Sequence, residues 1–108
     1  MEETIDLGQV LQPSPESTFI FRVKGDSMQE ANMPDGCLAV ADRFIKPVSG
    51  SIVVAMLDNE CTIKRLVKAG RHWVLHPENA FYKPVMITEE MDFRVLGVVT
   101  HVIVDLRK

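Results

Sequence analysis

The chain has 108 residues, of which 46% are hydrophobic and 25% are charged. This length is enough for one domain with its own core, and the composition excludes a disordered tail. A formal net charge of −3 and a pI near 5.5 argue against a surface that binds nucleic acid directly, because such surfaces are usually basic.

The first 17 residues differ from the rest of the chain. The segment 9–17 contains two prolines and few periodically spaced apolar positions, which is typical of an extended segment. We therefore expect a flexible N-terminal arm over residues 1–17 and a single domain over residues 18–108. The sequence shows no internal repeat and no low-complexity tract.

Alternating apolar and polar residues predict a series of short strands after the arm. The segment 18–24 places Phe19, Phe21 and Val23 on one face. Further strands are expected over residues 38–41, 51–57, 61–67, 72–75 and 93–104. Short strands with regular turns predict a mostly β domain of antiparallel strands.

The turns between these strands have recognisable residue types. In Pro34-Asp35-Gly36, proline presets one backbone dihedral and glycine allows a positive one. Further turns are expected at residues 58–60 and 68–71. Residues 27–31 offer a brief helical start.

Two residues in this pattern have the chemistry of a hydrolytic site. Ser27 lies in the turn-like sequence Gly25-Asp26-Ser27-Met28, and Lys64 lies in the predicted strand 61–67. A serine hydroxyl needs an adjacent base, and lysine is a base only when a low-dielectric environment lowers its pKa from about 10.4. Thr62 and Lys64 project from the same strand face, so the Thr62 hydroxyl is placed to orient the amine.

The same residues also have purely structural interpretations. Ser27 is a preferred N-cap for a short helix, and a lysine on a half-exposed strand is usually a surface residue. The first interpretation is compatible with a nucleophile, because a helix N-terminus also presents free backbone N–H groups to a developing oxyanion. The Ser27 N–H is the donor that we expect.

Several segments resemble those of the LexA/UmuD-type self-cleaving serine peptidases, most closely the UmuD-like members. The resemblance extends from about Asp6 to Arg107, and Lys64 follows Ser27 by 37 residues, an interval that suits the family. The matching segments occur in family order, over residues 21–28, 34–36, 50–55, 62–66, 75–79 and 97–103.

This resemblance implies a LexA/UmuD-type peptidase domain with a Ser27/Lys64 dyad. Lys64 would take the proton from Ser27, and the alkoxide would attack a peptide bond between a small residue and glycine. Met28 would line the cleft, Arg65 would face solvent, and Asp26 would be a turn or cap residue rather than a third catalytic group. The reaction needs no cofactor.

The resemblance also implies partners. A UmuD-like protein acts in the SOS response: RecA filaments on single-stranded DNA stimulate its self-cleavage, and the processed form serves an error-prone translesion polymerase as an accessory subunit. We expect a UmuC-like polymerase subunit as one partner and a second copy of the chain as another. The segment 98–104 is apolar on both faces, which suits a buried strand or a homodimer contact.

The cleavage site of the UmuD-like proteins lies further upstream than the 26 residues that precede Ser27. We therefore expect that this site is absent and that the chain corresponds to the processed form. The Ala-Gly pair at Ala69-Gly70 is expected in a hairpin turn instead.

Two other assignments use the same residues. The chain could be the C-terminal self-cleavage and dimerisation domain of a LexA-like or phage repressor, but the segment 3–11 resembles UmuD better than a repressor linker. Bacterial signal peptidase shares the Ser/Lys chemistry but needs a membrane anchor. No apolar stretch here approaches the roughly 18 residues that cross a bilayer, so we expect a cytoplasmic protein without membrane contact.

Histidines and cysteines give no metal signal. His72 and His76 have a suitable spacing for one strand face, but they lack the closely spaced partner ligands of a zinc site. His101 is expected to be a packed or interface residue. Cys37 and Cys61 are expected to be small buried thiols without a disulfide.

Overall fold

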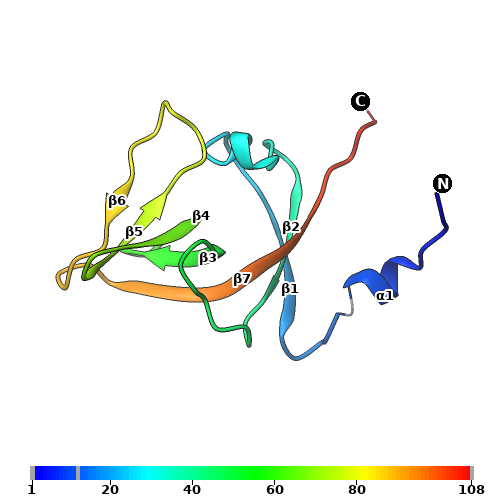
Figure 1. Cartoon of the computed structure of the whole chain (residues 1–108), viewed down its shortest axis with the longest axis horizontal. Helices are drawn as coiled ribbons and strands as arrows, with labels where there is room; N and C mark the ends of the chain where they lie inside the picture. Colours follow the sequence, from blue (N-terminus) through cyan, green and yellow to red (C-terminus); the bar gives the residue numbers. More distant parts are fainter. Residues whose placement is uncertain (1, 12, 108) are drawn as a thin grey trace.

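The computed structural model describes residues 2–11 and 13–107, so Met1 and Gln12 of the predicted arm and the terminal Lys108 lie outside the described residues. The described residues form an antiparallel seven-stranded sheet in the order β1-β2-β7-β3-β4-β5-β6 (Figure 1). The prediction of a mostly β domain of antiparallel strands is therefore confirmed. The strands are β1 (Thr18–Arg22), β2 (Leu38–Asp42), β3 (Ile52–Leu57), β4 (Glu60–Ala69), β5 (His72–His76), β6 (Val85–Met86) and β7 (Phe93–Ile103).

The strand ends and turns follow the sequence closely. The β3–β4 turn has left-handed backbone at Asp58 and Asn59, with φ of 48° and 70°, as a two-residue hairpin turn requires. Gly70, with φ of 63°, lies in the turn between β4 and β5 as expected, whereas Ala69 is the last residue of β4 and pairs with His72. β6 was not predicted, because two residues are too few to show an alternation.

The N-terminal segment contains a short helix, α1 (Leu7–Leu11), where we expected an extended chain. Asp6 is the signal that was missed: its side chain accepts a hydrogen bond from Gly8 N at 2.8 Å, and its carbonyl accepts from Gln9 N and Val10 N. Aspartate is a favoured residue at such a position. None of the helix residues is buried, so packing contributes little to its stability.

β7 connects the two halves of the sheet. It pairs with β2 toward its C-terminal end and with β3 toward its N-terminal end, and the register shifts once in each pairing. Such irregularities bend and twist a strand. In Figure 1, β1 and β2 lie on one side of this long strand and β3 to β6 on the other.

A hydrophobic cluster lies in each half of the described domain. The cluster near β1 and β2 consists of Val23, Met28, Met33, Cys37 and Ala39. The other lies around β3, β4 and β5 and consists of Val53, Ala55, Leu66, Leu75 and Val98. Because Met28 follows Ser27 directly and is buried, the first cluster anchors the turn that carries the serine.

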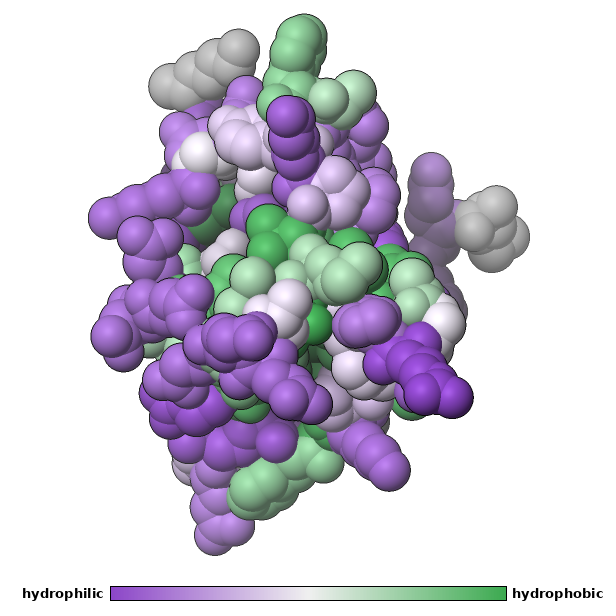
Figure 2. All heavy atoms as spheres, turned by 90° about the vertical axis from the view of Figure 1, so that its left-hand side faces the viewer, coloured by the Kyte–Doolittle hydropathy of each residue, from purple (hydrophilic) through white to green (hydrophobic). Residues whose placement is uncertain are grey.

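The end of the molecule that carries β5 and β6 exposes apolar side chains. Figure 2 shows this face, where hydrophobic side chains gather in the middle and hydrophilic ones surround them. Phe81 in the β5–β6 connection is 96% exposed, and Val85 and Met86 of the edge strand β6 are also exposed. Exposed apolar groups of this kind are common at sites that bind other chains.

A close approach at Gly97 supplies a stability prediction. A Cβ atom at this position in β7 would lie 2.7 Å from Phe19 Cζ and 3.1 Å from the backbone oxygen of Asp42. The carbonyl belongs to β2 and cannot move without loss of strand pairing, so we expect Gly97→Ala to lower the free energy of unfolding by about 1–3 kcal/mol. Urea unfolding measures this difference. Arg94→Ala, on an exposed position of the same strand, should change it by less than about 0.5 kcal/mol, and an equal effect of both would contradict the prediction.

Candidate functional site

The turn that carries Ser27 is held at both ends by buried side chains. Val23 and Met28 are buried in the first cluster, and Ser27 between them is partly exposed. Gly25 has φ of 85° and its N–H donates to Asp35 Oδ1 at 2.7 Å. Only glycine adopts this backbone region without strain, which explains the residue at this position.

The N-cap interpretation of Ser27 is wrong. A 3₁₀ turn, η1 (Gln29–Ala31), follows the serine, and its N-cap residue is Met28, which makes no side-chain capping bond. Asp26 lies in a turn, as interpreted, because its carbonyl accepts from Gln29 N at 3.1 Å. The Ser27 hydroxyl is therefore not used as a helix cap.

Lys64 lies on β4, between β3 and β5. Its side chain is half-buried, and Nζ donates to Thr62 Oγ1 at 2.7 Å and to the Ile63 carbonyl at 3.1 Å. Burial lowers the pKa of Lys64 from its ordinary value of 10.5, because removal of water disfavours the charged ammonium group. Thr62 and Lys64 thus meet on the strand, and the amine is partly desolvated.

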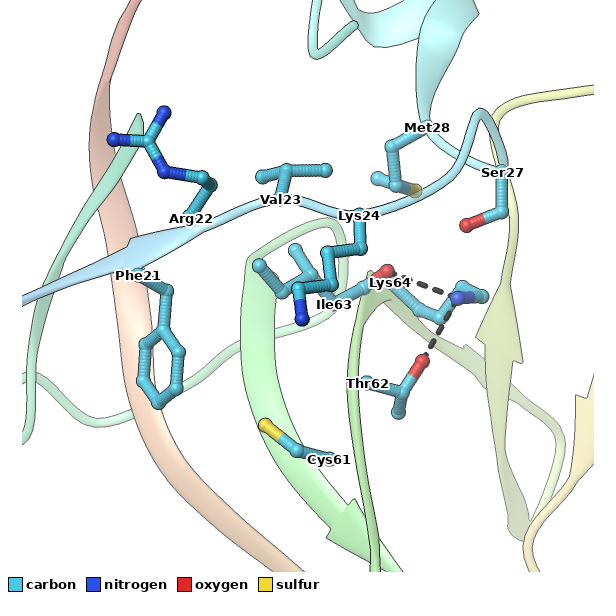
Figure 3. A pocket seen from close by; sticks show the side chains of 10 residues that line it. All are labelled: Phe21, Arg22, Val23, Lys24, Ser27, Met28, Cys61, Thr62, Ile63 and Lys64. Atoms are coloured by element: carbon cyan, nitrogen blue, oxygen red, sulfur yellow. Dashed lines mark hydrogen bonds between the residues drawn. The ribbon is translucent and has the colours of Figure 1, made fainter. Parts of the chain in front are cut away.

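Ser27 and Lys64 come together in one pocket of about 330 Å³. Figure 3 shows that the Ser27 hydroxyl and the Lys64 amine point toward one another from the turn and from β4. The residues that line the pocket are Phe21, Arg22, Val23, Lys24, Ser27, Met28, Cys61, Thr62, Ile63 and Lys64. Met28, which directly follows the serine, is one of these lining residues.

The hydrogen bonds of Lys64 suit a neutral amine. A neutral amine has two N–H donors and one lone pair, and Thr62 Oγ1 and the Ile63 carbonyl accept one donor each. The lone pair then stays free to accept a proton from a hydroxyl group in the pocket. This arrangement provides the elements of nucleophilic catalysis, namely a hydroxyl and a base that faces it.

A smaller pocket of about 120 Å³ continues from the first and shares Thr62 and Lys64 with it. Its other lining residues come from β3, β4, β5 and the segment around β6, and they are Leu57, Glu60, Leu75, Lys83 and Val85. The two pockets together extend from the Ser27 turn to Val85, one of the exposed apolar residues at the β5–β6 end of the molecule.

The segment 78–82, between β5 and β6, contacts the Ser27 turn, a contact that the sequence pattern does not predict. Glu78 N donates to Ser27 O at 2.8 Å, Asn79 Nδ2 donates to Asp26 O at 2.8 Å, and the Tyr82 hydroxyl donates to Asp26 Oδ1. A local signal was present, because Asn79 Oδ1 accepts from Phe81 N and forms a compact turn. The contact between this segment and the Ser27 turn joins residues more than 50 positions apart, and such a contact leaves no local signal in the sequence.

Two expectations about β4 are wrong. Arg65 is not simply solvent-facing: its side chain is 34% exposed, and its Nε lies 2.5 Å from Glu78 Oε1. Cys61 is exposed, whereas Cys37 is buried as expected. Cys61 lines the larger pocket, so this end of β4 is open and not covered by the core.

Among the described residues, no group of three or more His, Cys, Asp and Glu side chains is arranged to hold a metal ion. His72 and His76 are exposed at the two ends of β5, and the partly exposed His101 on β7 contacts Thr100 Oγ1. Over the described ranges, no helix has the length and apolar character needed to cross a membrane.

Comparisons with known proteins agree on one family. The family model described as "Peptidase S24-like" matches residues 1–100. The protein ImpA of Salmonella typhimurium is 39% identical over 110 residues, covering 94% of this chain and 69% of ImpA. The LexA repressor of Syntrophotalea carbinolica is 37% identical over 106 residues, covering 94% of this chain and 52% of the repressor. The chain spans about half the length of the LexA repressors that it matches.

Proposed function

The chain belongs to the Peptidase S24-like family, and from this premise we propose that it is a serine endopeptidase domain with Ser27 as nucleophile and Lys64 as general base. The observation that supports this best is the partly desolvated amine of Lys64, which faces the Ser27 hydroxyl in the larger pocket (Figure 3). A water-exposed lysine would be protonated at neutral pH and unable to act as a base.

In the proposed reaction, neutral Lys64 takes the proton from Ser27 Oγ while Oγ attacks the carbonyl carbon of the substrate. The backbone N–H of Ser27 is available to the resulting oxyanion, since among the described residues it has no backbone acceptor. The Lys64 ammonium group then gives its proton to the leaving amine. A water molecule, deprotonated by the same lysine, hydrolyses the acyl-enzyme and restores the serine.

Two neighbours assist this chemistry in the proposal. The Thr62 hydroxyl accepts one N–H of Lys64 and so fixes the direction of the amine lone pair. Met28 is almost completely buried and forms part of the pocket wall. The proposed substrate is a peptide bond between a small residue and glycine, in an arm of the same protein or of a partner.

The biological role that we propose is that of a UmuD-like SOS mutagenesis protein. In this role RecA filaments on single-stranded DNA stimulate cleavage, and the processed form assists a UmuC-like translesion polymerase. The resemblance of residues 3–11 to UmuD favours this role. Relatives that are named LexA repressor support the alternative, a self-cleavage and dimerisation domain of a repressor. A polymerase gene beside the coding sequence would favour the first, and a DNA-binding domain encoded upstream would favour the second.

The peptidase proposal is tested by incubation of the chain with a full-length relative whose own serine has been replaced. Cleavage of that relative at a single small-residue–glycine bond is the expected result. Substrate that stays intact under conditions in which the chain is folded would contradict the proposal.

We also propose a homodimer built on the C-terminal end of β7. Val99, Val102 and Ile103 are only partly buried there, and Val104 just beyond the strand is 41% exposed. Val104→Glu would place a charge in an isologous contact, so we expect it to convert the dimer to a monomer in sedimentation at micromolar concentration. Val48→Glu, in the β2–β3 connection, is the matched control and should leave the dimer intact. A wild-type chain that sediments as a monomer would refute the dimer.

A further inference from the structure

We propose that Tyr82 is a positioning residue that holds the Ser27 turn in place through its hydrogen bond to Asp26. The inference rests on the proposed role of Ser27 as nucleophile. Tyr82 lies on the connection between β5 and β6 and is not one of the residues that line the pocket with Ser27.

The Ser27 turn needs such support because it has little regular structure of its own. Ser27 lies between the end of β1 and η1, and Gly25, two residues before it, has left-handed backbone. A nucleophile on a loop is placed less accurately than one on a strand or helix, unless other groups fix it. Lys64, by contrast, lies within the sheet.

The segment 78–82 supplies this support through hydrogen bonds on both sides of the serine. Tyr82 OH and Asn79 Nδ2 donate to the side chain and the carbonyl of Asp26, directly before Ser27. Glu78 N donates to the Ser27 carbonyl, and Glu30 N donates to the Glu78 carbonyl beyond it. The serine is thus enclosed by bonds to one segment that lies more than 50 positions away in the sequence.

The same segment is tied to the strand that carries the lysine. Arg65 follows Lys64 on β4, and its Nε bonds Glu78 Oε1 while its Nη1 donates to the Gly50 carbonyl at 2.5 Å. Glu78 therefore contacts both the Ser27 turn and the neighbour of Lys64. Through this segment, the position of the hydroxyl is coupled to the position of the amine.

Tyr82 is the member of this network that a substitution can test most cleanly. Tyr82 is 44% exposed, so Tyr82→Phe removes one hydroxyl without a cavity in the core. The hydrogen bond to Asp26 and the negative charge of that carboxylate raise the pKa of Tyr82 above its ordinary value of 10.0, so the phenol keeps its proton at neutral pH. The bond to Asp26 therefore persists at neutral pH.

The kinetic test compares Tyr82→Phe with Phe81→Leu, a neighbouring change at an almost fully exposed position. We expect Tyr82→Phe to lower kcat by roughly tenfold or more, because the serine hydroxyl is displaced from its reactive position. KM should change by less than about twofold, because the residues that bind the substrate are unchanged. Phe81→Leu should leave kcat within about twofold of wild type. Asp26→Asn keeps an acceptor for the Tyr82 hydroxyl and should retain most of the activity, whereas Asp26→Ala should lose as much as Tyr82→Phe.

Amide hydrogen exchange tests the inference independently of activity. Tyr82→Phe should speed exchange of the Glu78 N–H, which bonds the Ser27 carbonyl, by roughly fivefold, while amides of β3 exchange as in wild type. Unchanged exchange at Glu78, or unchanged kcat despite faster exchange, would overturn the role of Tyr82. If the wild-type chain cleaves nothing, the peptidase proposal fails, and exchange alone decides whether Tyr82 holds the turn.

Discussion

Replacement of Ser27 or Lys64 by alanine should reduce cleavage of an inactive full-length relative by roughly 10³-fold or more. Each change removes one half of the proposed proton transfer: Ser27→Ala lacks the attacking oxygen, and Lys64→Ala lacks the amine that faces this oxygen (Figure 3). Because the two groups act as a unit, the double variant should be about as inactive as either single variant. The measurement is the initial rate of product formation with substrate in excess.

Lys68→Ala is the matched control for Lys64→Ala. Lys68 lies on the same strand but is exposed, with its amine 5.1 Å from the centre of the Trp73 ring. This variant should cleave within about twofold of the wild-type rate. Undiminished cleavage by Lys64→Ala, or by Ser27→Ala, would show that the proposed dyad is not the catalytic centre.

The strands could be predicted from the sequence because alternation with period two is a local signal. Residues 61–67 show it clearly, and the same alternation places Thr62 and Lys64 on one face, where their side chains form a hydrogen bond. The contact region of Ser27 and Lys64 cannot be predicted from local sequence, because the two residues are 37 positions apart. It depends on the order of strands in the sheet, and it entered the prediction only through resemblance to a family.

The errors of the sequence analysis have physical causes. Cys61 was expected to be buried because it lies in an apolar, strand-like segment, but the pocket leaves its end of β4 uncovered. Arg65 was expected in water because alternation cannot show that Glu78 reaches it from another connection. Tyr82 was missed for the same reason. Long-range polar contacts, which depend on loop paths, leave no periodic pattern in a sequence.

The rate of cleavage should rise with pH, by about tenfold per unit, until the pH reaches the lowered pKa of Lys64. Burial lowers this pKa from 10.5, so the neutral base is present at a lower pH than for a lysine in water. The plateau of the rate should therefore begin below pH 10.5. Initial rates of cleavage from neutral to alkaline pH measure the position of the rise.

Ser27→Cys separates the base from the nucleophile in this experiment. A thiol has an ordinary pKa near 8.5 and forms its own reactive anion, so it depends less on a neutral lysine. The rise for Ser27→Cys should therefore follow the thiol and lie at a different pH from the wild-type rise, which follows Lys64. If both enzymes share one profile, or if the wild-type rate falls as the pH increases from neutral, Lys64 is not the general base.

The same lowered pKa has a consequence for stability, with a defined sign. An unfolded chain binds the Lys64 proton up to pH 10.5, whereas the folded chain releases it at lower pH, so the free energy of unfolding should rise with pH between the two values. Below that window the half-buried ammonium group destabilises the fold, because it has lost part of its hydration. Lys64→Met removes the charge but keeps the length of the side chain, so it should be more stable than wild type at neutral pH, and this advantage should shrink as the pH approaches 10.5. A wild-type chain that is as stable as Lys64→Met at neutral pH would mean that the amine is solvated, and a solvated lysine is protonated there and cannot take the proton of Ser27.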